Sequence, residues 1–144
     1  GYLMALEQER TSRDYLFGRL LAVAEDIEGY ALYAAGEKAR DTSAARLMQR
    51  FADRPASTWR TIELSLRPYI SRLRATRPGP LHKKESLLDE IVALFEPQDF
   101  LSDSPLSGEF LLGYHCQRQS LRAPKEERED PSEASQPITS GEPA

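Results

Sequence analysis

The sequence predicts an all-α fold, a bundle of about five helices followed by a disordered acidic C-terminal tail. Apolar residues recur at alternating spacings of three and four through most of residues 1–122, which is the period of an amphipathic helix. No segment alternates with period two over a useful length, so strands are not expected. The 144 residues with 40% hydrophobic content suffice for a single core. We therefore expect one helical domain at 1–122 and a tail at 123–144.

The first helix is expected from about Ser12 to Tyr33. Thr11 or Ser12 can cap its start, because a hydroxyl accepts a hydrogen bond from a free backbone N–H of the first turn. Gly36 can end it, because glycine adopts the left-handed conformation that often follows a helix. The apolar stripe of this helix consists of Leu16, Leu20, Val23, Ile27 and Tyr30.

A second, shorter helix is expected from about Thr42 to Ala52, with Thr42 or Asp41 as its N-cap. A third helix begins at Pro55, since the missing N–H of proline is harmless in a first turn. Pro68 lies inside the third helix and should kink or locally break it, because it removes one backbone hydrogen bond. The inward residues are Ala44, Leu47, Met48 and Phe51 in the second helix and Trp59, Ile62, Leu66, Ile70 and Leu73 in the third.

The Arg-Pro-Gly-Pro run at 77–80 predicts a firm stop after the third helix, and a fourth helix follows and ends before Pro97. The next stretch is expected to be a loop with one turn around Phe100. Gly108 and Gly113 argue against a regular final helix, since a glycine costs ~1 kcal/mol relative to alanine in a helix interior. The apolar positions are Leu81, Leu87, Leu88, Ile91, Leu94 and Phe95 in the fourth helix and Phe110, Leu111, Tyr114 and Leu121 in the last.

Charge is strongly segregated along the chain, although the formal net charge is only −4. Residues 1–37, 38–84, 85–122 and 123–144 carry −4, +9, −5 and −4 in turn. A polyanion meets the local field of a surface, so the acidic average does not exclude a nucleic-acid partner. In the tail, Ile138 is the only large apolar side chain, which predicts disorder. Its acidity either shields the basic block and keeps the domain soluble or reflects an unselected terminus.

No residue pattern predicts catalysis, a cofactor or a metal site, so an enzyme is not expected. Cys116 is interpreted as a packed small residue, because neighbouring His115 points about 100° away from it on a helix. His82, the only other histidine, opens a helix beside two lysines. A single cysteine, no membrane-spanning run and no secretory signal together predict a cytoplasmic protein without membrane contact.

Arginines recur every four residues in the second helix and every seven in the third, so each set is expected on one helix face. Guanidinium groups make bidentate contacts to phosphate, which favours a groove for nucleic-acid backbones. Alternatively, these cations pair with the acidic first, fourth and fifth helices, since residues 1–122 sum to zero charge. The candidate nucleic-acid-binding residues are Arg46, Arg50, Arg54, Arg60, Arg67, Arg74, Lys83 and Lys84.

Three strings carry a family resemblance: ERTSRDYLFGRLLA at 9–22, AARLMQRFADRPASTW at 44–59 and PLSGEFLLGYHCQRQ at 105–119. They resemble the C-terminal helical region of the large subunit of the type I-C CRISPR Cascade complex, over about residues 2–122. The resemblance implies a separately translated small subunit made from an internal start, and Met4 lies close to where such a start would fall.

The same resemblance implies partners and a function. The partners would be the Cascade backbone and large subunits, further copies of this chain, and the R-loop of crRNA and target DNA. Bound there, the chain would stabilise the R-loop without reading base sequence, and its acidic first and last helices would face protein partners. The alternative is an assembly module of the same complex with little DNA contact. A transcription regulator would require a helix that reads base edges, and the sequence predicts none.

Overall fold

The computed structural model describes residues 5–37 and 41–122, and all regular structure in these residues is helical. The predicted all-α class is therefore confirmed, while the predicted tail lies outside the described residues. The elements in order are α1 (Arg13–Ala34), α2 (Ser43–Arg46), α3 (Met48–Asp53), α4 (Pro55–Thr76), α5 (Pro78–Val92), the 3-10 helix η2 (Pro97–Leu101) and α6 (Glu109–Arg122).

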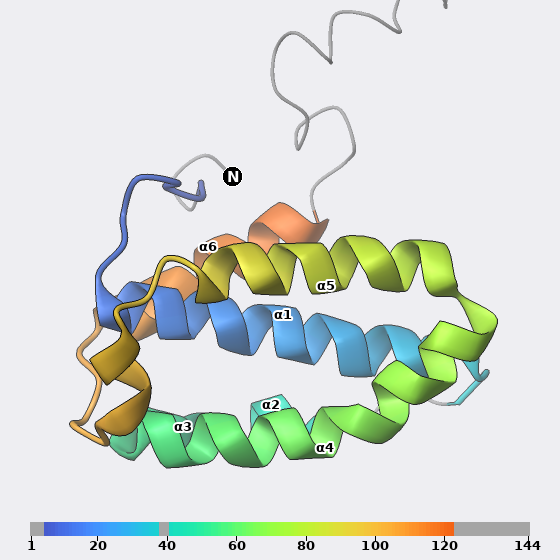
Figure 1. Cartoon of the computed structure of the whole chain (residues 1–144), viewed down its shortest axis with the longest axis horizontal. Coiled ribbons are helices and arrows are strands. Elements are labelled where there is room, and N and C mark those ends of the chain that lie inside the picture. The colour runs from blue at the N-terminus through green and yellow to red at the C-terminus, as the bar shows by residue number, and fades with distance from the viewer. Residues whose placement is uncertain (1–4, 38–40, 123–144) are drawn as a thin grey trace, which may run out of the picture.

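Helix α1 is the central element of the bundle. Figure 1 shows it between α4 and α5, with α6 alongside its first half. Its side chains are buried on nearly every side from Tyr15 to Ala24, not only along the single stripe that the sequence predicts. A helix that is apolar all round belongs in the interior of a bundle. Both ends follow the prediction, since Ser12 accepts a hydrogen bond from the N–H of Tyr15 and Gly36 has a φ of 74°.

The predicted second helix is divided into α2 and α3. Thr42 caps α2 as expected, with its hydroxyl accepting from the N–H of Ala45 at 3.1 Å. Leu47 then leaves the helical conformation at φ −99° and ψ 7°, so the single continuous helix of the prediction is wrong. Ala44 on α2 and Phe51 on α3 are both buried.

The corner between α4 and α5 is tighter than predicted. Helix α4 continues through Pro68 without interruption, and Figure 1 shows its second half turning toward α5. The predicted stop is confirmed, since α4 ends at Thr76. Only Arg77 separates the two helices, however, because α5 already begins at Pro78 within the run. Proline is accommodated there because a first-turn N–H has no intrahelical acceptor.

Helices α1 and α6 touch backbone to backbone at two glycines. A Cβ added to Gly18 would lie 2.1 Å from the carbonyl oxygen of Phe110, and one added to Gly113 would lie 2.1 Å from that of Tyr15. Gly113, predicted to make the last helix irregular, instead permits this close approach. Nearby, the buried Arg19 donates to Gln117 at 2.7 Å. Later residues of α1 contact later residues of α6, from Ser12 with Glu109 to Glu25 with Arg118, so the two helices run parallel.

Phe17 joins separate parts of the chain at one end of the core. Its ring centroid lies 5.6 Å from that of Phe51, 4.8 Å from that of Phe95 and 5.6 Å from that of Phe100. These rings come from α1, from α3, from the link after α5 and from η2, whose turn at Phe100 confirms the predicted one. Two of the apolar positions named for the last two predicted helices, Leu94 and Leu111, are 41% and 46% exposed, and Leu94 lies beyond the end of α5.

Tyr114 links α6 to α1 through its hydroxyl, which donates to the Glu25 carboxylate at 2.8 Å. Burial of the phenol is the larger cause and the bond to Glu25 the smaller one, and together they raise the pKa of Tyr114 to about 12. The unfolded chain releases this phenolic proton near pH 10, so folding stability contributed by Tyr114 is lost as the pH rises through about 10 to about 12.

Replacing Tyr114 with phenylalanine is therefore expected to flatten the alkaline end of the stability profile. Its free energy of unfolding should fall less between about pH 9 and about pH 12 than that of the unmodified chain. Urea unfolding followed by circular dichroism at each pH measures this difference. An exposed tyrosine, Tyr33, provides the matched control as Tyr33→Phe, and identical profiles for all three proteins would contradict the prediction.

Candidate nucleic-acid interface

The outer face of α4 carries the most regular part of the predicted surface. Arg60, Arg67 and Arg74 recur every seven residues, and all three side chains are exposed. Seven residues are close to two turns, so the three positions share one side of the helix. Trp59 and Leu66, each one position before an arginine and therefore about 100° around the helix, are buried and pack into the core, as does Ile62. Burial of the apolar stripe thus turns these arginines toward solvent.

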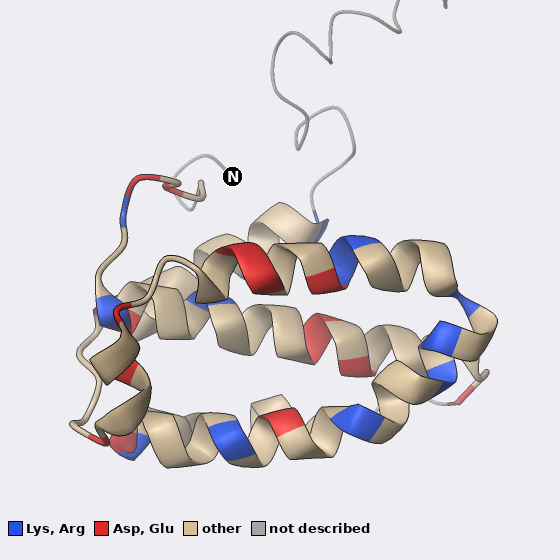
Figure 2. Cartoon of the chain, in the orientation of Figure 1, with Lys and Arg blue, Asp and Glu red and all other residues tan. Residues whose placement is uncertain are grey.

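Most of the eight predicted cations have no carboxylate partner within residues 5–37 and 41–122. Arg74 and Lys84 form ion pairs, and the other six do not: Arg46, Arg50, Arg54, Arg60, Arg67 and Lys83. Elsewhere, Arg10, Arg13 and Arg118 are paired and Arg19 is buried. Arg122, at the end of α6, is exposed and forms no ion pair with the described residues. Figure 2 shows basic positions spread along α4 and around the α4–α5 corner.

Ion pairing across this corner ties one of the α4 arginines to α5. Arg74 lies 3.1 Å from the Glu85 carboxylate, while 63% of the Arg74 side chain remains exposed. A second pair joins Arg72 to Glu37 at 3.4 Å, and the Arg72 guanidinium also lies 5.5 Å from the Tyr69 ring centroid. Exposed pairs of this kind are weak and dissociate readily, so Arg74 remains accessible to another anion.

Lys84 lies on the inner side of α5, away from the predicted surface. Its ammonium contacts the Asp26 carboxylate of α1 at 2.6 Å and lies 4.8 Å from the Tyr30 ring centroid. Only 19% of the side chain is exposed, whereas neighbouring Lys83 is exposed and unpaired. Consecutive helical residues point about 100° apart, so two adjacent lysines meet different surroundings. Lys84 is therefore a link between α5 and α1 in this structure.

The Lys84→Gln substitution is expected to lower stability without weakening nucleic-acid binding. It leaves Asp26 without its cation in a partly buried position, which should reduce the free energy of unfolding by about 1–2 kcal/mol. Lys83→Gln, the matched control, should leave stability within about 0.5 kcal/mol of the unmodified chain. Chemical unfolding measures both effects, and equal stabilities for the two variants would contradict this placement.

The predicted arginine ridge of the second helix is not continuous. The break at Leu47 separates Arg46 on α2 from Arg50 on α3. Arg46 turns back to the start of its own helix, where it donates to the Asp41 carbonyl at 2.8 Å and the Ser43 hydroxyl at 3.1 Å. Arg54 occupies the junction before α4, with φ −143° and ψ 75°. The spacing of four therefore does not produce one row, because the segment is not one helix.

Carboxylates border the α4 face without neutralising it. Asp103 accepts from the N–H of Ser57 at 2.9 Å, and its bonds to Ser57 hold the pKa of Asp103 below its usual value. The same carboxylate acts on Arg60 through space, and Arg60 also donates to the Phe100 carbonyl at 3.5 Å. Glu63 lies between the arginines of α4. Partial burial raises the pKa of Glu63, although the nearby positive charge of Arg67 acts to lower it.

Arg77 and Arg122 are two further exposed cations that were not among the eight predicted residues. Neither forms an ion pair with the described residues, and Arg77 donates to the Thr76 carbonyl at 2.9 Å. Arg77 extends the positive region at the α4–α5 corner, as the charge run of the sequence suggested. Arg122 ends α6 on another part of the bundle, and no sequence signal connects it to the α4 face.

The remaining reactive side chains have ordinary surroundings. Cys116 is buried, as predicted for a packed small residue, while His82 and His115 are exposed. Within residues 5–37 and 41–122, no group of histidine, cysteine and acidic side chains has the arrangement of a metal site. None of the helices described here is long and apolar enough to cross a bilayer.

The described residues form an all-helical domain whose α4 face carries exposed arginines. The chain belongs to the Cas_Csd1 family of CRISPR-associated proteins, whose family model matches residues 1–122. Membership indicates a component of a CRISPR Cascade complex. No curated protein matches the chain. The match ends at the residue where the sequence predicts the helical domain to end.

Proposed function

We propose that the chain is the small subunit of a type I-C Cascade complex and that it stabilises the R-loop by binding DNA backbone. It corresponds in this proposal to the C-terminal helical region of the large subunit, made as a separate polypeptide. Its neighbours are the backbone and large subunits and further copies of itself. It acts in the cytoplasm and catalyses no reaction of its own.

The observation that carries the proposal is the unequal pairing of the arginines. Of the described arginines on α1 and α6, all but Arg122 are ion-paired or buried. On α3 and α4, Arg72 and Arg74 are paired, and the other exposed arginines form no ion pair with the described residues. Arg50, Arg60 and Arg67 are the central members of this group. Exposed cations that make no ion pair within the fold are available to bind an external anion. Guanidinium groups match the geometry of phosphate, so a nucleic-acid backbone is a suitable anion.

Backbone contacts are the kind of interaction that an R-loop needs. The heteroduplex is about as stable as the DNA duplex that it replaces, so modest protein contacts can shift the equilibrium. Contacts with phosphates carry no sequence information and do not restrict the choice of target. A row of arginines along an exposed helix meets both requirements.

The test reverses Arg50, Arg60 and Arg67 to glutamate together and measures retention of target DNA by the reconstituted complex across a salt series. Each lost phosphate contact should reduce the slope of log affinity against log salt by about 0.9 for duplex DNA, or about 0.7 for a single strand. Loss of the three arginines should therefore lower the slope by about 2–3 and weaken binding strongly at low salt. Unchanged affinity and slope would refute the proposal.

A matched pair of single variants controls for net charge. Arg67→Glu and Arg122→Glu both reverse one exposed, unpaired arginine, but Arg122 lies at the end of α6. Only the α4 variant should weaken DNA retention. If arginine changes are silent while changes in exposed apolar residues reduce the subunit stoichiometry, the chain is an assembly module with little DNA contact.

A further inference from the structure

Tyr33 is an exposed aromatic residue on the side of α1 that faces α5. Its side chain is 78% exposed, and it follows Asp26 and Tyr30 along one helix stripe at spacings of four and three. That stripe faces α5, because Lys84 contacts the Asp26 carboxylate at 2.6 Å and lies 4.8 Å from the Tyr30 ring centroid. Tyr33 is thus the next residue of this stripe toward the end of α1.

The direction of packing places Tyr33 near the start of α5. Early in α1, the Phe17 ring centroid lies 4.8 Å from that of Phe95, which comes just after α5. Later in α1, Tyr30 lies beside Lys84 instead. The two helices are therefore antiparallel, and the residues after Tyr30 approach the first turns of α5. Figure 1 shows this end of α1 beside the corner between α4 and α5.

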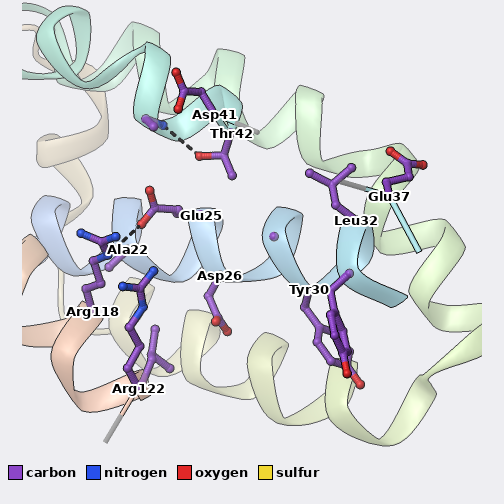
Figure 3. A pocket seen from close by; sticks show the side chains of 14 residues that line it. Ala22, Glu25, Asp26, Tyr30, Leu32, Glu37, Asp41, Thr42, Arg118 and Arg122 are labelled. Carbon is purple, nitrogen blue, oxygen red and sulfur yellow. Dashed lines mark hydrogen bonds and ion pairs between the residues drawn. The ribbon is translucent and has the colours of Figure 1, made fainter. Parts of the chain in front are cut away.

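One face of the Tyr33 ring is covered by Tyr30, and the other face is open. The two ring centroids lie 6.3 Å apart at an interplanar angle of 27°, which is a stacked arrangement. Both rings line an open cleft of about 550 Å³ along α1, and Figure 3 shows Tyr30 toward one end of it, away from Arg118. Gly29 leaves further room, since no heavy atom lies within 4 Å of a Cβ placed on it. A planar group therefore has space to stack on Tyr33.

The charged side chains nearest to these two rings neutralise one another. Asp26 pairs with Lys84, and Glu37 pairs with Arg72 at 3.4 Å. Asp41 forms no ion pair with the described residues, but Figure 3 shows it on the opposite side of α1 from Asp26. The space beside the rings is therefore close to neutral, which suits an uncharged group better than an ion.

Cations without a carboxylate partner lie at the adjoining corner. Arg77 and Lys83 are exposed and form no ion pair within the described part of the chain. Arg74 belongs to the row of exposed arginines on α4 and reaches the corner through its pair with Glu85. A strand bound along α4 would thus meet further cations beside Tyr33. Proteins hold single-stranded nucleic acid by this combination, with phosphates on the cations and bases on aromatic rings.

We propose that Tyr33 stacks on an unpaired base of single-stranded DNA, while Arg77 and Lys83 contact the neighbouring phosphates. The inference rests on the proposed DNA contact of α4 and adds a preference for single strands over duplex. Bases in a duplex are stacked on their neighbours, so they must be flipped out before they can meet a protein ring. Every base has a π-face, so this contact does not restrict the choice of target.

The Tyr33→Ala variant of the full chain tests the stack. Its affinity for a single-stranded DNA oligonucleotide should fall by about fivefold or more, which is the loss typical of one stacked base. The slope of log affinity against log salt should stay the same, because no phosphate contact is removed. Affinity for duplex DNA of the same length should also stay the same.

Three further variants control for the ring itself. Tyr33→Phe keeps the ring and should bind like the unmodified chain, whereas Tyr33→Leu is apolar without a flat face and should lose affinity as Tyr33→Ala does. Leu101→Ala truncates another apolar residue, 84% exposed, and should bind normally. Thermal melting checks that each variant folds, and the Leu and Ala variants provide two independent tests of the same contact.

An oligonucleotide with abasic residues identifies the group that Tyr33 contacts. The unmodified chain and Tyr33→Ala should bind it equally, since no base remains to stack. Equal affinities of these two proteins for the normal single strand would overturn the proposal, as would the same loss of affinity on the abasic strand. Reduced incorporation of Tyr33→Ala into the reconstituted complex, with normal DNA binding, would also overturn it, because Tyr33 would then contact a protein.

The base contact and the arginine contact fail separately in this design. Reversal of Arg50, Arg60 and Arg67 should weaken binding to single-stranded and duplex DNA alike and lower the salt slope. Tyr33→Ala should change only the affinity for single strands. If the arginine variant binds normally while Tyr33→Ala does not, the proposed DNA surface on α4 is refuted and the base contact is retained.

Discussion

Replacing Gly18 with alanine is expected to destabilise the fold by about 3 kcal/mol, at the upper end for an added methyl group. The new Cβ would meet the Phe110 carbonyl oxygen at 2.1 Å and the Tyr114 backbone nitrogen at 2.5 Å. Both obstacles are backbone atoms of α6, so no side-chain rotation can relieve the clash. The helices must separate, which opens packing along their shared length.

The reciprocal and control substitutions sharpen this prediction. Gly113→Ala should destabilise similarly, because its Cβ would lie 2.1 Å from the Tyr15 carbonyl oxygen. Gly29→Ala, also on α1, meets no atom within 4 Å and should stabilise the chain by ~1 kcal/mol through helix propensity. Urea unfolding of the three variants measures the contrast. Similar midpoints for Gly18→Ala and Gly29→Ala would show that α1 and α6 do not approach this closely.

The Phe17→Ala substitution is expected to lower the free energy of unfolding by about 4 kcal/mol. Phe17 is fully buried, and its ring contacts those of Phe51, Phe95 and Phe100. Truncation would leave a cavity among aromatic rings from separate elements, which cannot all move inward together. The end of the bundle formed by α3 and η2 should therefore show the largest increase in hydrogen exchange.

Two controls separate the cavity from a general loss of apolar surface. Leu101→Ala removes a side chain that is 84% exposed on η2, and stability should stay within about 0.5 kcal/mol. Phe17→Leu keeps most of the volume and should destabilise less than Phe17→Ala. Equal midpoints for Phe17→Ala and Leu101→Ala in urea unfolding would contradict the central placement of Phe17.

Local rules in the sequence predicted the helices well. Ser12, Thr42, Pro55 and Gly36 lie at helix ends as their chemistry requires, because capping depends on residues within one turn. Apolar spacing predicted most of the buried residues for a similar reason, since a helix places positions three and four apart on one face. It missed Phe17 because a single stripe cannot describe a helix covered on several sides.

The candidate site was predictable only where a helix is regular. Arg60 and Arg67 share an exposed face of α4 because seven residues return to nearly the same direction. Arg46 and Arg50 are separated by the break at Leu47, which depends on how α2 and α3 each meet the core. Whether a cation is paired depends on distant residues, so spacing alone did not distinguish Lys84 from Lys83.

The order of residues was sufficient to specify an all-α chain, its helix ends and a basic middle third, since these depend on neighbours within a turn or two. Tertiary packing decided which charged side chains pair within the fold and which stay free to bind a partner. Asp26 pairs with Lys84 across 58 positions of sequence, and Gly18 meets Gly113 across a still larger separation in the chain. Such contacts arise when helices assemble around α1, because long-range geometry determines which side chains meet and which stay exposed.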